Sequence, residues 1–510
     1  MVVMNLISST AAAPHVSAPV TGIAFDNSYA RLPSRFYAQV EPTPVAAPRL
    51  VQLNHRLASD LGLDADALAG PDGLAMLSGN RLPAGAASIA LAYAGHQFGH
   101  FVPQLGDGRA LLLGEVIGRD GRRRDLQLKG SGQTPFSRRG DGRAALGPVL
   151  REYLVSEAMA ALGIPTTRSL AAVATGQRVM REAALPGAIL TRVASSHLRV
   201  GTFQYFAARR DTEALSLLAK HAMQRHYPEA AEAPNPLCAL IAAVAERQAA
   251  LVASWLLVGF VHGVMNTDNA SIAGETIDYG PCAFQDAYDP GMVLSAIDQM
   301  GRYAYANQPG IAHWNVVRFA ETLLPLLDAN EDAAADLARA ALSAFTPRFQ
   351  AEYRAGLARK IGLPPTDPAS AALAEDLLAR MAANHADFTL TFRRLAAAAI
   401  DPKADAEVRA LFDDAQAYDT WAAPWRARLA ELGGDPWARH AAMQRANPAF
   451  IPRNHQVEAA LEAAQAQGDF NRFETLLAVL ARPYEDQPER ADLAAPPRAE
   501  ERVLQTFCGT

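Results

Sequence analysis

The sequence is poor in cysteine. Its 510 residues include only three cysteines, Cys238, Cys282 and Cys508. None of them stands in a CxxC pair or at the spacing of a metal site, which argues against a secreted disulfide scaffold and against a structural zinc site. We therefore expect a protein of a reducing compartment, the cytoplasm.

The sequence also lacks a surplus of positive charge. Lysine and arginine number 47, aspartate and glutamate number 53, and the net charge is -6. Because nucleic-acid-binding domains contact phosphates through clustered basic residues, this balance predicts no nucleic-acid partner. It still permits a local basic pocket.

No apolar segment has the length of a membrane span. The longest candidate, Ala249 to Met265, is interrupted by Ser254 and His262, and a spanning helix needs about 20 apolar residues. The stretch is better explained as a buried core helix, so no membrane association is expected. The N-terminus lacks a basic region followed by an apolar run, which is typical of a loose tail and not of a secretory signal.

Glycine and proline are not in excess either. The sequence contains 35 glycines and 33 prolines, which are ordinary frequencies, so the chain is neither collagen-like nor mostly disordered. A chain of this length can form several packed units around a real core.

A β-hairpin is the clearest local signal in the sequence. Two strand-like segments, Arg109 to Ile117 and Asp125 to Lys129, flank the pair Asp120-Gly121, which favours a tight turn. Alternation along the second segment places its leucines on one face and Lys129 on the other. We therefore expect Lys129 to leave the core and face a cleft.

The rest of the chain combines a few strands with many helices. A helix is predicted for Gly147 to Leu162, before the stop signal Gly163-Ile164-Pro165. From about Phe319 to Leu480 the sequence is rich in alanine and helix-forming. Further predicted elements are a helix at Leu50 to Leu63 followed by a turn at Gly70 to Gly73, strands at Ser169 to Ala174 and Ala188 to Val193, and helices near Thr212 to Tyr227 and Pro236 to Phe260.

Lys129 and Glu152 are spaced like a phosphate-binding lysine and the carboxylate that orients it. The lysine ends a strand and the glutamate follows some twenty residues later on a helix, which is the order found in kinase-like folds. Glu157 on the same helix is a competing partner. A solvated lysine with an ordinary surface pair is the alternative.

Two glycine-bearing turns are candidate phosphate sites. Gly106-Asp107-Gly108-Arg109 precedes the hairpin, and Ser137 to Arg143 combines Asp141 and Gly142 with three arginines. Backbone amides in such turns can approach phosphate oxygens, and guanidinium groups bind anions. Solvated turns are the alternative. Arg192 and Arg199 are candidates for a second clamp on phosphates, or else salt-bridge residues.

A polar cluster follows the apolar stretch, from His262 to Asn269, and Asp278 follows nine residues later. Asn269 and Asp278 offer the hard oxygen ligands that magnesium takes beside nucleotide phosphates. Asp268 is then free to accept a proton. An Asx turn is the alternative for this cluster, and His262 alone is better explained as a buried structural histidine. In this order along the chain, the motifs describe a nucleotide cleft between a small lobe and a helical lobe.

Five longer segments carry specific motifs. They are YAGHQFGHFVPQLGDGRALLLGE (Tyr93 to Glu115), LKGSGQTPFSRRGDGRAALGPVLREYLVSEAMAALGIPTTRSL (Leu128 to Leu170), HGVMNTDNASIAGETIDYGP (His262 to Pro281), GRYAYANQP (Gly301 to Pro309) and NPAFIPRNH (Asn447 to His455). Through these segments the chain resembles the selenoprotein O (SelO) family of protein adenylyltransferases, from about Phe25 to the C-terminus.

The resemblance implies an α+β, protein-kinase-like two-lobed fold with a small β-rich N-lobe, a helical C-lobe and additional C-terminal helices. The expected parts are an N-terminal wrapping segment at 1–85, a nucleotide-binding N-lobe at 86–168, a C-lobe with the catalytic and metal-binding loops at 169–325, a C-terminal helical extension at 326–480 and an irregular tail at 481–510.

The resemblance also implies protein adenylylation. The family binds ATP in a flipped orientation relative to ordinary kinases, so that AMP passes to a Ser, Thr or Tyr hydroxyl of a protein. The family's proton acceptor falls on Asp268, its metal ligands fall on Asn269 and Asp278, and Glu152 matches the ion-pair partner of the lysine. Magnesium is the expected metal, with manganese open. The nucleotide contacts fall on Gly106, Gly108, Arg109, Lys129, Asp141, Gly142, Arg192 and Arg199.

The cysteines follow the family pattern only in part. Members of the family can carry a redox-active cysteine or selenocysteine near the C-terminus, a place that Cys508 fits. Some bacterial members have a partner cysteine after the metal-binding loop, where this sequence has Leu294. Cys282 is better explained as a buried, inert thiol. A conventional phosphotransferase on the same fold and a catalytically silent nucleotide-binding regulator remain the alternative functions.

Overall fold

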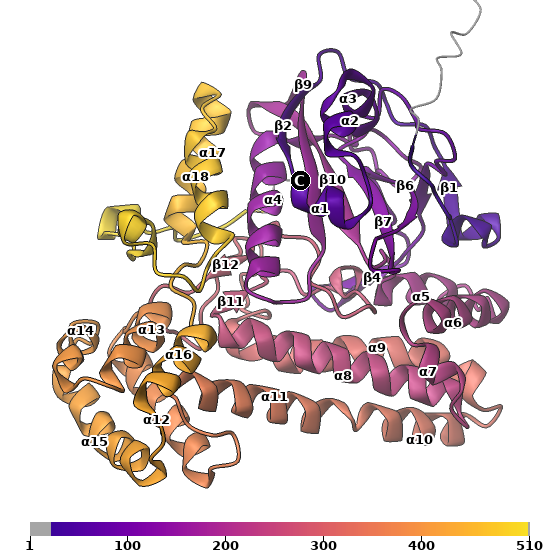
Figure 1. Cartoon of the computed structure of the whole chain (residues 1–510). Helices are drawn as coiled ribbons and strands as arrows, with labels where there is room; N and C mark the ends of the chain where they lie inside the picture. Colours follow the sequence, from indigo (N-terminus) through magenta and orange to yellow (C-terminus); the bar gives the residue numbers. More distant parts are fainter. Residues whose placement is uncertain (1–21, 508–510) are drawn as a thin grey trace, which may run out of the picture.

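The structure is a computed structural model that describes residues 22–507 (Figure 1). An antiparallel sheet forms most of its N-terminal part, with the strand order β1-β3-β6-β7-β10-β9-β2 and β8 paired to β10. The strands are β1 Tyr37–Gln39, β2 Arg49–Leu53, β3 Ile89–Leu91, β6 Ala110–Ile117, β7 Arg123–Lys129, β8 Ala144–Ala145, β9 Arg168–Met180 and β10 Ala184–Ala194. Together with the many helices, this sheet agrees with the predicted α+β class.

The predicted hairpin is confirmed. Strands β6 and β7 pair antiparallel, with Ala110 opposite Lys129 and Ile117 opposite Arg123. Leu126 and Leu128 are fully buried in the core beneath the sheet. Lys129 stands at the end of β7 and lines a cavity, as the alternation predicts.

The predicted helix after the hairpin is also confirmed, as α4 (Leu146–Ala161). It lies along the sheet, and the C-terminal helices α17 (Asn454–Gln467) and α18 (Asn471–Leu480) pack against it (Figure 1). One apolar core joins Leu150 and Tyr153 of α4 to these two helices. Helices α17 and α18 therefore support α4, the helix that carries Glu152.

Two local predictions near the N-terminus are wrong. The helix expected from Leu50 begins only at α1 (His55–Asp60), because residues 49–53 form the edge strand β2, which pairs with β9. The turn expected at residues 70–73 is the start of helix α3 (Pro71–Leu77), with Pro71 in its first turn. In the first case, sheet pairing outweighs local helix preference.

Long helices form a layer beside the sheet (Figure 1). The apolar stretch lies in α8 (Pro236–Leu257) and in the short strand β11 (Phe260–Val261), so the helix ends earlier than predicted. Helix α8 packs against α9 and α11. Among the described helices, α8 alone is long and apolar enough to cross a membrane, and 50% of its most apolar window is buried in the protein.

The alanine-rich region forms helices as predicted, around a second core that contains Trp421 and Trp425. In residues 481–507, the regular structure consists of short helical pieces and an isolated bridge between Thr506 and Ser295. The remaining elements are α2 Ala65–Ala69, β4 Gly95–Gln97, β5 His100–Val102, α5 Val200–Ala207, α6 Thr212–His226, α7 Pro228–Ala231, β12 Ala283–Phe284, α9 Gln308–Leu327, α10 Glu331–Leu342, α11 Phe345–Lys360, α12 Pro368–Ala383, α13 Phe388–Ala398, α14 Asp405–Arg409, α15 Ala415–Leu432, α16 Pro436–Ala446 and α19 Ala491–Ala494, with 3-10 turns η1 Tyr29–Arg31, η2 Ser34–Phe36, η3 Thr267–Asn269, η4 Tyr305–Asn307, η5 Pro402–Ala404, η6 Pro488–Arg490 and η7 Ala499–Glu501.

Candidate active site

A cavity of about 800 Å³ collects the residues that the sequence singles out. It is lined by the turn before β6, the end of β7, the loop after β7, strand β10, the start of α5 and the turn η3. All the predicted site residues line it: Gly106, Gly108, Arg109, Lys129, Asp141, Gly142, Arg192, Arg199, Asp268, Asn269 and Asp278. The fold therefore brings together positions from 106 to 278.

An ion cluster forms one end of this cavity. Lys129 Nζ donates to Glu152 Oε2 at 2.6 Å and to Asp278 Oδ1 at 2.8 Å. Arg192 Nε donates to the other oxygen of Glu152 at 2.7 Å. Burial raises the pKa of Asp278 and of Glu152, but Lys129 and Arg192 more than offset that effect and hold each pKa below its usual range. Both carboxylates are therefore ionised at neutral pH.

Glu157, the competing partner for Lys129, has a different role. Its carboxylate accepts hydrogen bonds from Arg168 at 2.7 Å and from Asn54 at 2.7 Å. It thereby ties α4 to strand β9 and to the start of α1. The prediction that Glu152 pairs with the lysine is confirmed.

Asp268 is a buried carboxylate that is only partly hydrogen-bonded. Its Oδ2 accepts a hydrogen bond from Gln97 Nε2 at 3.2 Å, and its backbone oxygen accepts one from Arg199 Nη1 at 3.0 Å. Among the described residues, nothing hydrogen-bonds to Oδ1, although this atom is buried. Burial raises the pKa of Asp268 to about 6, despite the opposing effect of Arg199. Such a group, beside a cavity, can accept a proton.

The β4–β5 hairpin holds the turn that carries Asp268. The backbone amide of His96 donates to Thr267 Oγ1 at 2.6 Å, and that of Phe98 donates to Asn266 Oδ1 at 3.0 Å. A Cβ atom at Gly95 would lie 2.5 Å from Asp268 Oδ1. The hairpin therefore fixes the carboxylate in place, with Gln97 as its direct contact. Gln97 has no predicted role, because no local pattern signals a contact between positions 97 and 268.

The glycine turns are packed too tightly for any side chain. Gly106 has φ +80°, and a Cβ there would lie 2.3 Å from the Phe136 ring. Gly142 has φ +68°, and a Cβ there would lie 2.1 Å from Gly132. Both turns thus bring backbone to the cavity wall.

Cationic side chains outnumber acidic ones along the cavity. Beyond the predicted set, Arg138, Arg143 and Arg181 line it, and Arg181 pairs with Asp141 at 2.8 Å. Arg199 stacks over Tyr93, with its guanidinium carbon 4.4 Å from the ring centroid. This surplus suits an anionic ligand such as a polyphosphate.

Asn269 and Asp278 offer oxygen ligands that fit a hard cation whose further ligands are phosphate oxygens. The Asn269 amide nitrogen donates to the Val264 carbonyl at 3.1 Å, which leaves the amide oxygen as its free ligand atom. Asp278 uses Oδ1 for Lys129, which leaves Oδ2. In residues 22–507, no group of three or more His, Cys, Asp or Glu side chains forms a metal site. Two oxygen ligands beside a phosphate site are typical of magnesium.

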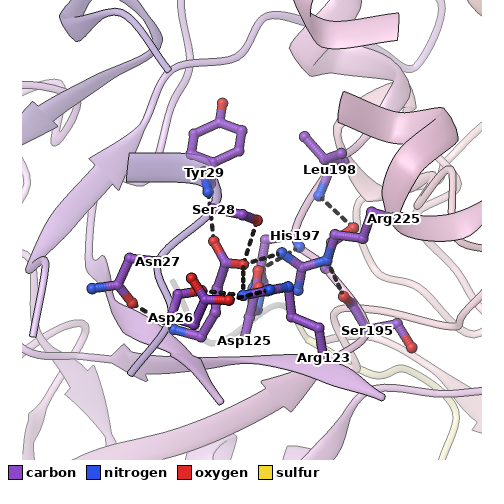
Figure 2. Close-up of polar contacts among 12 residues, drawn as sticks. Asp26, Asn27, Ser28, Tyr29, Arg123, Asp125, Ser195, His197, Leu198 and Arg225 are labelled. Carbon is purple, nitrogen blue, oxygen red and sulfur yellow. Dashed lines mark hydrogen bonds and ion pairs between the residues drawn. The ribbon is translucent and has the colours of Figure 1, made fainter. Parts of the chain in front are cut away.

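A second buried charge cluster lies outside the cavity (Figure 2). Arg225 of α6 pairs with Glu115 at 2.8 Å and with Asp125 at 2.5 Å, and His197 Nδ1 contacts Asp125 at 2.9 Å. Arg123 joins this cluster to Asp26 in the N-terminal segment. None of these residues lines the cavity. The cluster fastens the N-terminal segment and α6 to the sheet.

The two cysteines within the described range are free. Cys282 is buried, as predicted, and burial raises the pKa of its thiol to about 12. Cys508, the candidate redox residue, lies outside the described residues. The backbone amide of Thr506 donates to the Leu294 carbonyl at 2.7 Å, so the tail passes beside the position at which the family's partner cysteine was expected.

Comparison with known proteins agrees with the resemblance. Residues 19–481 match the family model described as protein adenylyltransferase SelO. The chain is 65% identical over 486 residues to a protein nucleotidyltransferase YdiU of Rhodopseudomonas palustris. It is 65% identical over 492 residues to one of Methylorubrum extorquens and 63% identical over 486 residues to one of a Bradyrhizobium species. Each match covers 95% of this chain and 99% of the relative.

Proposed function

The chain belongs to the SelO family and is a nucleotidyltransferase, and from this premise we propose that it transfers AMP from ATP to Ser, Thr or Tyr hydroxyls of protein acceptors. The observation that carries the proposal is the Asp268 carboxylate, which stands at the wall of a cation-rich cavity, is only partly hydrogen-bonded and has a pKa raised by burial. We test this proposal against two alternative functions, a conventional phosphotransferase and a catalytically silent regulator.

In the proposed reaction, the acceptor oxygen attacks the α-phosphorus of ATP. A bond forms between that oxygen and the α-phosphorus, the bond from the α-phosphorus to the bridging oxygen breaks, and pyrophosphate leaves. The Asp268 carboxylate receives the proton of the hydroxyl. The products are the AMP ester of the protein and pyrophosphate.

The remaining groups bind and orient the nucleotide. Lys129, held by Glu152, and Arg192 with Arg199 would neutralise phosphate charge, and the turns at Gly106 and Gly142 would offer backbone amides. Asn269 and Asp278 would hold the divalent metal, which we propose to be magnesium. When bound, the metal would offset charge on the phosphates and the leaving group.

This proposal includes the flipped nucleotide and the kinase-like, two-lobed architecture with the domain boundaries expected from the sequence. It also includes a cytoplasmic location, without nucleic-acid or membrane partners. The order of sheet, Lys129, Glu152, Asp268 and Asp278 along the chain supports the architecture. The adjacent Asp268 and Asn269 support a departure from ordinary kinases, whose catalytic loop separates the corresponding residues.

Labelled ATP tests the reaction class. The wild-type protein is incubated with magnesium, a mixture of acceptor proteins and ATP labelled at either the α- or the γ-phosphate. We expect protein-bound label from α-labelled ATP only. Asp268→Asn should abolish the label, whereas Asp336→Asn, at an exposed ion pair on α10, should retain it. Label from γ-labelled ATP only would show a phosphotransferase, and ATP binding without any label would show a silent regulator.

A further inference from the structure

A short turn and the tip of the β4–β5 hairpin form the rim of the cavity near Asp268. The turn spans residues 297–303 and is fixed by Asp298, whose carboxylate accepts hydrogen bonds from the backbone amides of Arg302 and Tyr303 at 2.9 and 2.7 Å. Ile297 at its start lines the cavity. Phe98 in the hairpin packs on Tyr303, with ring centroids 5.1 Å apart.

Arg302 lies against the hairpin tip. A Cβ atom at Gly99 would lie 3.5 Å from its guanidinium carbon, so Arg302 lies beside the tip of the hairpin. That guanidinium lies 4.9 Å from the centroid of the Trp314 ring. Within residues 22–507, no carboxylate forms an ion pair with it, and its buried Nε has no hydrogen-bond partner. A cation held in this way retains its capacity to bind an anion.

A second arginine shares the same aromatic platform. The Arg318 guanidinium lies 5.0 Å from the centroid of Trp314, and it pairs with Glu321 at 2.5 Å. Two guanidinium groups therefore share one indole, and Glu321 pairs with one of them. The oxygens of Asp298, on the same turn, accept hydrogen bonds from backbone amides. Burial lowers the pKa of the neighbouring His96, and the charges of both arginines add to that effect. Arg302 is thus the guanidinium of this pair that has no carboxylate partner among the described residues.

Exposed apolar side chains accompany this charge. Ile297 is 51% exposed, and Met300 is 93% exposed on the same turn. Phe101, at the other strand of the hairpin, is 40% exposed and packs on His96 with ring centroids 4.9 Å apart. Large apolar groups around an unpaired cation at the mouth of a cavity are typical of a polypeptide-binding surface.

We propose that this rim binds the acceptor polypeptide, and that Arg302 pairs with an acidic side chain near the hydroxyl that Asp268 deprotonates. The inference rests on the proposed function and names its substrate class: an acceptor segment with a nearby Asp or Glu. Gln97 contacts Asp268, and Gly99, two residues later, lies beside Arg302. An extended acceptor that lies along the hairpin tip, at about 3.4 Å per residue, would present its acidic side chain about two to four residues from the hydroxyl.

Synthetic peptides with a single hydroxyl test the proposal. Peptides with Asp, Asn or Lys placed two, three or four residues to either side of the hydroxyl are compared as acceptors of label from α-labelled ATP. The wild-type enzyme should prefer the best Asp peptide over its Lys counterpart by about tenfold in kcat/KM, the value of one charge-assisted pair. Arg302→Glu should reverse this preference, and Arg302→Gln should remove it.

Matched controls separate this inference from the proposed function. Arg354→Glu, which makes the same charge change at an exposed position of α11, should keep the wild-type preference. Nucleotide affinity and the melting temperature of the Arg302 variants should equal those of the wild type. If the wild type labels all peptides equally, or if Arg302→Glu keeps the preference for Asp, the inference is wrong and the function stands. If the wild type labels none of the peptides, the proposed transfer to hydroxyls is itself wrong.

Discussion

The cavity and the second charge cluster (Figure 2) both contain several buried charged side chains, but the two regions differ in how fully those charges are paired. In the cluster, Arg225 contacts two carboxylates, and the neighbouring Arg123 also contacts two. In the cavity, Asp268 keeps an oxygen without a partner among the described residues, and six arginines line the wall. Buried charge alone therefore does not mark a site in this protein. The site is marked by buried charged side chains that are incompletely paired and that line a cavity.

Because Asp268 is the incompletely paired carboxylate of the cavity, its substitution should cause the largest loss of activity. Asp268→Asn removes the proton acceptor while keeping the size of the side chain, so kcat should fall by about 100- to 10,000-fold. The affinity for ATP should change little, because Asp268 faces the acceptor. Single-turnover transfer of α-label and calorimetric ATP binding measure the two quantities. An unchanged kcat would remove Asp268 from the mechanism.

Arg225 should show the opposite pattern. Arg225→Met leaves two buried carboxylates, Glu115 and Asp125, with fewer partners, which should lower the free energy of unfolding by about 3–5 kcal/mol. Denaturant titration measures this loss. Arg339→Met, which removes an exposed pair on α10, should change the free energy by less than about 1 kcal/mol. If Arg225→Met kept full stability but abolished transfer, the cluster would belong to the site.

Lys360 is a buried charged residue outside both regions, and it lies against aromatic rings. Its ammonium group lies 4.4 Å from the centroid of Phe392, and burial lowers its pKa to about 7. In the unfolded chain the pKa of lysine is about 10.4, so between pH 7 and that value only the unfolded state holds the proton. Stability should therefore rise with pH by about 1.4 kcal/mol per unit from this residue.

Lys360→Met tests that slope. The variant removes the charge and keeps an apolar side chain of similar length. Denaturant titrations of wild type and variant at several pH values between about 7 and 9 should show the variant to be the more stable, with a difference that shrinks as the pH rises. A difference that is independent of pH would contradict a depressed pKa in the folded state.

Gln97 should have the smallest of these effects. Gln97→Met keeps the bulk of the side chain but removes the hydrogen bond to the Asp268 carboxylate, which is long at 3.2 Å. The kcat should therefore fall by about tenfold, the low end of the range for a hydrogen bond to a charged group. KM for ATP and the melting temperature should stay unchanged. Gln104→Met, which alters an exposed glutamine after the hairpin, serves as the control. A fall as large as that of Asp268→Asn would give Gln97 a direct part in the reaction.

Local patterns predict the parts of the site that lie on single elements. The hairpin with Lys129, the helix with Glu152 and the acidic cluster at residues 268–278 each follow from periodicity and residue chemistry. The choice between Glu152 and Glu157 does not follow from the pattern alone, because both glutamates stand on the same predicted helix. The partner of Glu157, Arg168, stands on the next strand.

Contacts between distant segments could not be predicted in this way. Residues 49–53 have helical character in isolation, but they form an edge strand because β9 offers backbone partners. Gln97 meets Asp268, and Arg302 meets the hairpin tip, only after the helical layer and the sheet have packed. Such contacts depend on tertiary packing and leave no periodic signal in the sequence.

The position of the nucleotide is the most direct test of the account. A crystal structure with a non-hydrolysable ATP analogue and magnesium would locate each phosphate relative to Asp268. We expect the α-phosphate to be the phosphate nearest to the Asp268 carboxylate, with Lys129, Arg192 and Arg199 on the phosphates beyond it. A γ-phosphate nearest to Asp268, with the α-phosphate at the far end of the cavity, would contradict AMP transfer.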